Sequence, residues 1–317
     1  MRAYIIRRVL LLIPTVFLVS LIIFFLIRLI PGDIIDQMVA NWEFVAQIDR
    51  AALEHNLGLD VPIVIQYGRW VGNIVTHGDF GNSLWEGTPV IKRIATAWPI
   101  TIELGFLGLI TSLAVGVPIA IYSALRQDAW GDYVARSFAI MCIAVPSFWV
   151  GTMIIVLPSI WWGYTPSIVL IPFTQDPIGN LKMFIVPALI LGMSMSGVTM
   201  RITRTMMLEV LRQDYIRTAW AKGLKERAVV IRHALKNALI PVVTLVGGEL
   251  GILVGGTVII ENIFCLPGMG RLLLESIQDR DYTMVSGIML IFGVFMVLIN
   301  LLVDLTYVVL DPRVSFK

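Results

Sequence analysis

One acidic side chain, Glu249, stands inside a long apolar stretch and falls near the predicted centre of the bilayer. An ionised carboxylate at that depth costs at least ~2.5 kcal/mol on insertion scales. A carboxyl group kept at such a cost should face a water-filled path, a polar partner or a proton. Two interpretations therefore stay open: Glu249 lies on a translocation path, or it makes a structural hydrogen bond inside a helix bundle.

Other chemistries lack the residues that they need. No stretch has the form G-x-x-x-x-G-K-[ST], so we expect no ATP in a Gly-rich phosphate loop, and G-x-S-x-G and H-E-x-x-H are absent as well. Three histidines (His55, His77 and His233) have no partner at metal-ligand spacing, and two cysteines are too few for a metal cluster or a disulfide framework. We expect no catalytic residue, no metal and no cofactor in this chain.

The composition is that of a membrane protein with several spans. Hydrophobic residues make up 57% of the 317 residues and charged residues 15%, with a mean hydropathy of +0.85. Six apolar stretches are long enough to cross a bilayer as helices. They are Val9–Ile27, Ile100–Leu125, Ser137–Ile160, Met183–Met200, Ala238–Phe264 and Tyr282–Leu310. The first is too long for a signal-peptide core, so we expect it to stay as a transmembrane helix.

Basic residues orient these spans. Arg2, Arg7 and Arg8 precede the first span, and Arg126 and Arg136 bracket the connection between the second and third. Because Lys and Arg accumulate on the cytoplasmic side, we expect both termini in the cytoplasm. The predicted fold is an all-α membrane protein with six transmembrane helices.

Three regions follow from this pattern. Residues 1–96 hold the first span and an extracytoplasmic segment, residues 97–310 form the main transmembrane domain, and residues 311–317 are a short cytoplasmic tail. Within the extracytoplasmic segment we expect a helix over Glu43–His55 and an interfacial helix over Pro62–Val75 with an apolar, partly aromatic face. The segment is either a covering flap or a contact for the solute.

A basic insert separates the fourth and fifth spans. Residues 201–236 carry nine Lys and Arg against three Asp and Glu, a net charge of +6 in a chain whose total is +2. The pattern predicts one helix over Thr205–Lys222 that stops at Gly223, and a second over Lys225–Leu239. The second helix has an apolar face of Ala228, Ile231, Leu235 and Leu239. Such a helix fits a protein joint or a membrane surface, and a basic loop held by anionic lipid is the alternative.

The basic insert resembles the cytoplasmic coupling loop of ABC-importer permeases of the dipeptide, oligopeptide and nickel type. The likeness lies in the runs QDYIRTA (213–219), AKGL (221–224) and HALKNALIP (233–241). Arg217-Thr218-Ala219 takes the place of the general Glu-Ala-Ala signature, Gly223 falls in register, and Trp220 stands where an arginine is expected. The resemblance implies a type I importer permease fold and a loop that docks into a groove on an ATPase subunit. The docking residues that it implies are Asp214, Tyr215, Arg217, Thr218, Ala219, Ala221, Lys222, Gly223 and Leu224.

Family-like stretches occur along most of the chain. They include LGLD (57–60), GDFGNS (78–83), TIEL (101–104), PSFW (146–149), ENIF (261–264), RDY (280–282) and DPR (311–313). Glu103 and Asn262 fall in two of them and join Glu249 as candidates for the translocation path. The resemblance implies a second, homologous permease subunit, two ATPase subunits that bind ATP and Mg, an extracytoplasmic solute-binding protein and membrane lipid as partners. The chain would then not be an enzyme by itself.

The fifth span carries Gly247, Gly251 and Gly255 at i+4 spacing, a pattern typical of close helix packing. The basic insert has no nucleic-acid fold signature, so we expect no nucleic-acid partner. Dipeptides, longer peptides, nickel chelates and oligosaccharides all stay open as solutes. Two other classes of protein also stay open: a stand-alone secondary transporter driven by protonation of Glu249, and a structural membrane subunit without solute flux.

Overall fold

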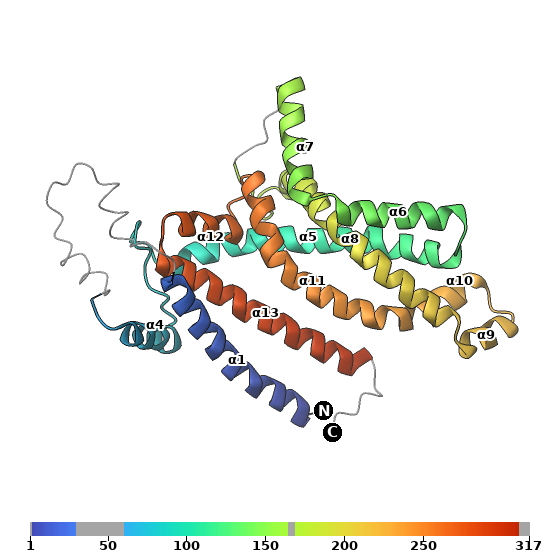
Figure 1. Cartoon of the computed structure of the whole chain (residues 1–317), viewed down its shortest axis with the longest axis horizontal. Helices are drawn as coiled ribbons and strands as arrows, with labels where there is room; N and C mark the ends of the chain where they lie inside the picture. The colour runs from blue at the N-terminus through green and yellow to red at the C-terminus, as the bar shows by residue number, and fades with distance from the viewer. Residues whose placement is uncertain (1, 30–59, 164–168, 311–317) are drawn as a thin grey trace. The chain divides into compact units, whose positions relative to one another are not determined.

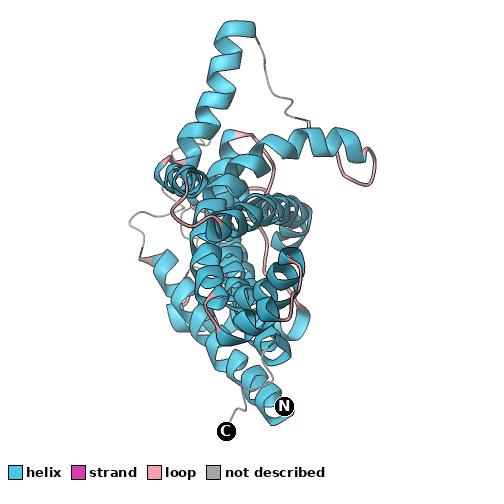
Figure 2. Ribbon diagram, turned by 90° about the vertical axis from the view of Figure 1, so that its right-hand side faces the viewer, coloured by secondary structure: helices cyan, strands magenta, loops and turns pink. Residues whose placement is uncertain are grey.

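The computed structural model describes residues 2–29, 60–163 and 169–310, and nearly all of them are helical (Figures 1 and 2). The helices are α1 (Arg2–Arg28), α4 (Ile63–His77), α5 (Val90–Leu125), α6 (Trp130–Ala144), α7 (Ser147–Trp162), α8 (Pro177–Leu211), α9 (Asp214–Ala221), α10 (Glu226–Ala228), the π-helix η1 (Val229–Leu235), α11 (Lys236–Ile263), α12 (Met269–Gln278) and α13 (Tyr282–Leu310). Within these ranges the β structure is one isolated bridge, Asn82 to Pro89. The helix expected over Glu43–His55 and the tail 311–317 lie outside the described residues.

Five of these helices are long and apolar enough to cross a membrane, and a bent pair brings the number to six. The all-helical, multi-span prediction is confirmed. The third predicted span, Ser137–Ile160, is bent, because α6 and α7 meet at 83° (Figure 1). Pro146 lies at the bend and has no N–H for a helical bond, and its ring disfavours a helical conformation at Val145, which is extended with φ −84° and ψ 120°.

The described chain forms two compact units. Unit 1 contains Thr101–Leu266 and the chain from Ile299, and unit 2 contains Arg2–Ile100 and Pro267–Leu298. In unit 1, α8 packs most extensively against α6 and α11. A Cβ on Gly197 of α8 would lie 2.6 Å from the carbonyl oxygen of Ala139 on α6, so this close helix approach requires glycine.

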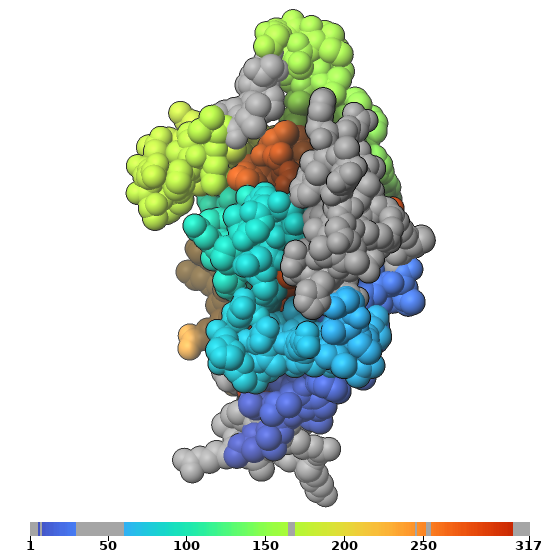
Figure 3. All heavy atoms as spheres, turned by 90° about the vertical axis from the view of Figure 1, so that its left-hand side faces the viewer, coloured from blue at the N-terminus to red at the C-terminus, as the bar shows by residue number. Residues whose placement is uncertain are grey.

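In unit 2, aromatic side chains join α1 to α4. Phe24 lies edge to face with Tyr67 at 5.2 Å between ring centroids and also contacts Trp70. Ser20 and Tyr67 share a hydrogen bond of 2.9 Å. Val64, Ile65 and Val75 of α4 stay exposed. Figure 3 shows the residues of α4 in blue at the surface that faces the viewer. The helix predicted over Pro62–Val75 is confirmed, with both ends within two residues.

The basic insert differs from the prediction at two points. The single helix over Thr205–Lys222 is wrong, because α8 ends at Leu211 and Gln213 is extended, with φ −72° and ψ 148°, before α9 begins. The second helix is not separate either, since α10 and η1 run into α11, and Pro241 lies inside α11. The stop at Gly223 is confirmed: its φ of +72° is left-handed, a conformation that glycine adopts without steric cost.

Candidate functional site

Helix α9 presents most of its residues to solvent at one end of unit 1. Figure 1 shows it beyond the ends of α8 and α11. Tyr215 and Trp220 are each 44% exposed, and Asp214, Arg217, Thr218 and Ala221 are exposed as well. Lys222, Gly223 and Leu224 continue this exposed surface beyond the end of the helix. Eight of the nine predicted docking residues are thus available to a partner.

Ala219, the ninth, is not available. Its side chain is 5% exposed, and with the fully buried Ile216 it joins a core made by four neighbouring segments. Ala124 of α5, Met207 of α8, Val230 of η1 and Ala238 of α11 belong to the same cluster. The prediction of Ala219 as a direct docking contact is therefore wrong. Its small side chain is needed because α9 packs closely on its own chain.

The π-helix η1 packs against the buried side of α9. Its buried residues are Val229, Val230 and Ala234, whereas Ile231 is 51% exposed. The apolar face predicted with α-helical spacing is therefore wrong at Ile231. A π-helix bonds residue i to residue i+5, so Val229 and Ala234 come to the same side.

A buried ion pair lies close to this core. The Arg204 guanidinium on α8 donates to both oxygens of Asp132 on α6, from Nε at 2.8 Å and from Nη2 at 2.7 Å. Ser123 of α5 donates to the same carboxylate, and the backbone N–H of Asp128 donates to it at 3.1 Å. The Asp132 side chain is fully buried. Sequence reasoning missed this pair, because the two residues are 72 positions apart and only the packing of α6 on α8 brings them together.

Glu249 lies on α11 in unit 1 and is 4% exposed. The Thr199 hydroxyl on α8 donates to its Oε1 at 3.0 Å, and Ser112 of α5 shares a 2.9 Å hydrogen bond with Thr199. Among the described residues Oε2 has no hydrogen-bond partner. The predicted hydrogen bond of Glu249 is present, and one carboxylate oxygen is left for a further ligand.

The other two path candidates lie apart from Glu249. Glu103 is half-buried and accepts a 3.4 Å hydrogen bond from Asn180, and Asn262 is exposed. Residues close to them in sequence form the buried contact, since Thr101 donates to Oε1 of Glu261 at 2.6 Å. Sequence reasoning chose the right two stretches and missed these two residues, because the helix faces that meet are set by packing.

Residues 116–316 match the family described as "Binding-protein-dependent transport system inner membrane component", and residues 1–105 match its N-terminal region. The chain belongs to this family. It is a multi-pass permease of the inner membrane, the transmembrane component of an ABC importer.

Two relatives match over the whole length of both chains. The dipeptide transport system permease protein DppB of Escherichia coli (strain K12) is 36% identical over 340 residues and covers 100% of each chain. A protein of Brucella suis biovar 1 (strain 1330), named as a proposed peptide transport system permease, is 40% identical over 316 residues with the same coverage. Among solved structures, the MetNI methionine ABC transporter in an inward-facing conformation matches 70% of this chain and 97% of its own, with a TM-score of 0.54 and 15% identity. That likeness shows a shared fold.

Unit 2 of the permease contains a short hairpin before α5. Ser83 and the N–H of Leu84 both donate to Oδ2 of Asp281, at 2.6 and 3.0 Å, and Trp85 donates to the Asp279 carbonyl at 2.6 Å. The hairpin therefore joins the family-like stretches GDFGNS and RDY, which stand about 200 residues apart in the sequence. Burial raises the pKa of the Asp281 carboxyl, and the hydrogen bonds from Ser83 and the backbone oppose that rise.

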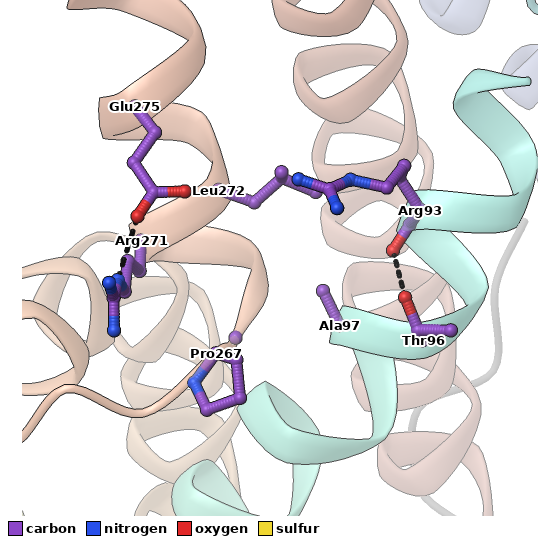
Figure 4. Close-up of a pocket in the computed structure, with 8 residues that line it drawn as sticks. Arg93, Thr96, Ala97, Pro267, Arg271, Leu272 and Glu275 are labelled. Atoms are coloured by element: carbon purple, nitrogen blue, oxygen red, sulfur yellow. Dashed lines mark hydrogen bonds and ion pairs between the residues drawn. The ribbon is translucent and has the colours of Figure 1, made fainter. Parts of the chain in front are cut away.

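A pocket of about 210 Å³ lies between the start of α5 and α12 in unit 2 (Figure 4). Arg93, Thr96 and Ala97 line one side, and Pro267, Gly268, Arg271, Leu272 and Glu275 line the other. Arg271 pairs with Glu275 at 2.8 Å, and Arg93 pairs with Glu86 at 3.3 Å. Sequence reasoning named none of these side chains as a site, because the two helices are far apart in sequence.

The glycines predicted to pack differ in their surroundings. A Cβ on Gly247 would overlap the side chain of Val303 on α13, whereas a Cβ on Gly255 would meet no atom of the described residues within 4 Å. Gly251 is half-buried. The packing role is supported at Gly247. At Gly255 it stays a prediction, which a structure with the second permease subunit would test.

Proposed function

We propose that this chain is one of two permease subunits of an importer for short peptides. Full-length similarity to permeases named for dipeptide and peptide transport supports this class of solute. The observation that carries the coupling role is α9, a short helix with an exposed polar and aromatic outer face and a buried inner face. One of two ATPase subunits, which would bind ATP and Mg, docks on that face, and an extracytoplasmic binding protein delivers the peptide.

The buried face of α9 explains how docking can act on the membrane helices. Ile216 and Ala219 contact a core shared by α5, α8, η1 and α11, and protein cores are packed too densely to absorb a displacement. A push on the exposed face would therefore move the ends of three long helices together. The left-handed stop at Gly223 ends α9 before the chain continues into α10 and η1.

Glu249 is the candidate for the path in this proposal, and its Oε2, which has no hydrogen-bond partner within the described ranges, supports it. The chain Ser112, Thr199, Glu249 links α5, α8 and α11 across the buried centre of unit 1. A stand-alone transporter driven by protons is not retained, because transport in this family depends on a binding protein.

Reconstitution tests the proposed function. The chain with its partner permease, ATPases and binding protein should take up a dipeptide into vesicles with ATP, and this chain alone should not. Gly223→Val should lower substrate-stimulated ATP hydrolysis, since a β-branched residue is strained at positive φ. Gly223→Asn is the matched control, because asparagine tolerates that conformation and, in the described part of the chain, no atom lies within 4 Å of the Cβ position. Normal coupling in the valine variant would place the joint elsewhere.

A further inference from the structure

We propose that the pocket between α5 and α12 binds the free carboxylate end of the transported peptide, with Arg93 as its main contact. This inference rests on the proposed function for the class of solute. It adds a recognition site in unit 2, outside the helix core of unit 1 that carries Glu249.

The size of the pocket limits what it can hold. A volume of about 210 Å³ is several times the ~30 Å³ that a water molecule occupies in the liquid, and smaller than most sites for whole drug-sized ligands. It suits a group of about one amino-acid residue. One end of a peptide fits this limit.

The charged side chains around the pocket can be displaced from their present partners. The Arg93 and Glu86 side chains are 42% and 47% exposed. An ion pair that is so exposed to water contributes little to stability. A ligand carboxylate can therefore replace Glu86. The guanidinium suits this exchange, because its planar N–H groups bind a carboxylate through two parallel hydrogen bonds. Figure 4 shows Arg93 reaching from α5 towards Leu272 on α12.

The balance of charge favours a peptide end over a simple anion. Arg93, Arg271 and Glu275 line the pocket and Glu86 pairs with Arg93 beside it, so these four side chains together sum to zero charge. A multiply charged anion would gain from Arg93 and be repelled by both glutamates. A peptide end brings one carboxylate, a polar backbone and one side chain. Ala97, Pro267 and Leu272 supply an apolar surface for that side chain.

The test compares one dipeptide in two forms, alanyl-phenylalanine and its C-terminal amide, in the reconstituted complex. Arg93→Gln should reduce the ratio of kcat/KM for the free acid to that for the amide by at least about tenfold, the size expected for the loss of one of its two charge-assisted hydrogen bonds. Arg93→Lys should keep part of the preference. Lys92→Gln is the control: it removes an exposed positive charge one residue away and does not line the pocket, so the ratio should not change. The binding protein is the same in every assay, so its own preference cancels.

An unchanged ratio in Arg93→Gln would overturn the proposal. Equal loss of both peptides, together with weaker docking of the binding protein, would also overturn it and place an acidic side chain of that protein in the pocket. Uptake of neither peptide by the wild-type complex would instead refute the proposed function. If Arg93→Gln does not assemble, a Thr96→Cys variant lacking Cys142 and Cys265 gives a second measurement. The free acid should slow its reaction with maleimide and the amide should not, and equal rates would reject the site.

Discussion

Ser83 and Asp281 stand 198 residues apart in the sequence, and the Ser83 hydroxyl donates a 2.6 Å hydrogen bond to the buried Asp281 carboxylate. The same oxygen accepts the N–H of Leu84, and the other oxygen accepts the N–H of Met284 at the start of α13. One side chain thus fixes both the hairpin before α5 and the beginning of the last helix. It holds unit 2 together at the point where two distant segments meet.

This contact predicts a pH dependence of stability. Burial raises the pKa of Asp281 above its ordinary value of 3.8, so between the two values the folded protein binds more protons than the unfolded chain. The contribution is complete below pH 3.8 and is lost as pH rises through the raised pKa. Asp281→Asn should remove this slope from the melting temperature of the complex and destabilise it by about 1 to 3 kcal/mol, since an amide has one acceptor oxygen instead of two. Asp279→Asn, at an exposed position, is the control. Parallel melting curves for wild type and Asp281→Asn would contradict the prediction.

Neighbouring positions on α9 should separate folding from coupling. Ala219→Glu places a charge in the core shared with Met207 and Val230, so we expect loss of the assembled permease. Thr218→Glu adds the same side chain at an exposed position, so the permease should fold normally. If the exposed face docks the ATPase, Thr218→Glu lowers only substrate-stimulated ATP hydrolysis. The two measurements are the yield of folded permease in detergent and the ATPase rate of the full complex. Normal yield for Ala219→Glu would show that the core described around it does not form.

Removing one partner of the Asp132–Arg204 ion pair should lower the free energy of unfolding substantially. Arg204→Gln leaves a fully buried carboxylate without its cation, which typically costs 3 to 5 kcal/mol. Arg136 also approaches Asp132, at 3.6 Å, but its side chain is 40% exposed, so Arg136→Gln should cost less than about 1 kcal/mol. Denaturant unfolding in mild detergent gives both values, and equal costs for the two variants would argue against the pair as the stabilising contact.

The spans could be predicted because apolar length alone determines which segments enter a bilayer. The stop at Gly223 could be predicted for a similar reason, since the left-handed conformation favours glycine locally. The bend at Pro146 was also encoded locally, but the span was predicted from apolar length, which does not report a bend. Errors of this kind arise where two local signals compete.

The remaining errors depend on contacts between distant segments. The π-helix η1 places Val229 and Ala234 on one side, where they pack on α9, and α-helical spacing could not show this. The predicted path residues lie close to the pair that makes the contact. Glu103 is two residues from Thr101, and Asn262 is one residue from Glu261. A one-residue shift turns a helix position by about 100°. Only packing decides which of two neighbours faces inward.

Glu249 offers the sharpest test of the path. Glu249→Gln keeps an oxygen that can accept the Thr199 hydrogen bond but removes the ionisable group, so we expect normal assembly and altered peptide uptake. Thr199→Val is the matched change on the other side of this bond. It removes the donor while leaving the carboxyl group, and a structural role for the bond predicts a loss of about 1 to 3 kcal/mol in stability. Uptake into vesicles and the yield of intact complex should be measured for both variants. Reduced uptake with normal yield in Glu249→Gln places the carboxyl group on the path, and reduced yield in both variants makes it a structural residue. Wild-type uptake and yield in both would exclude Glu249 from either role, because the carboxyl group and its donor would then both be dispensable.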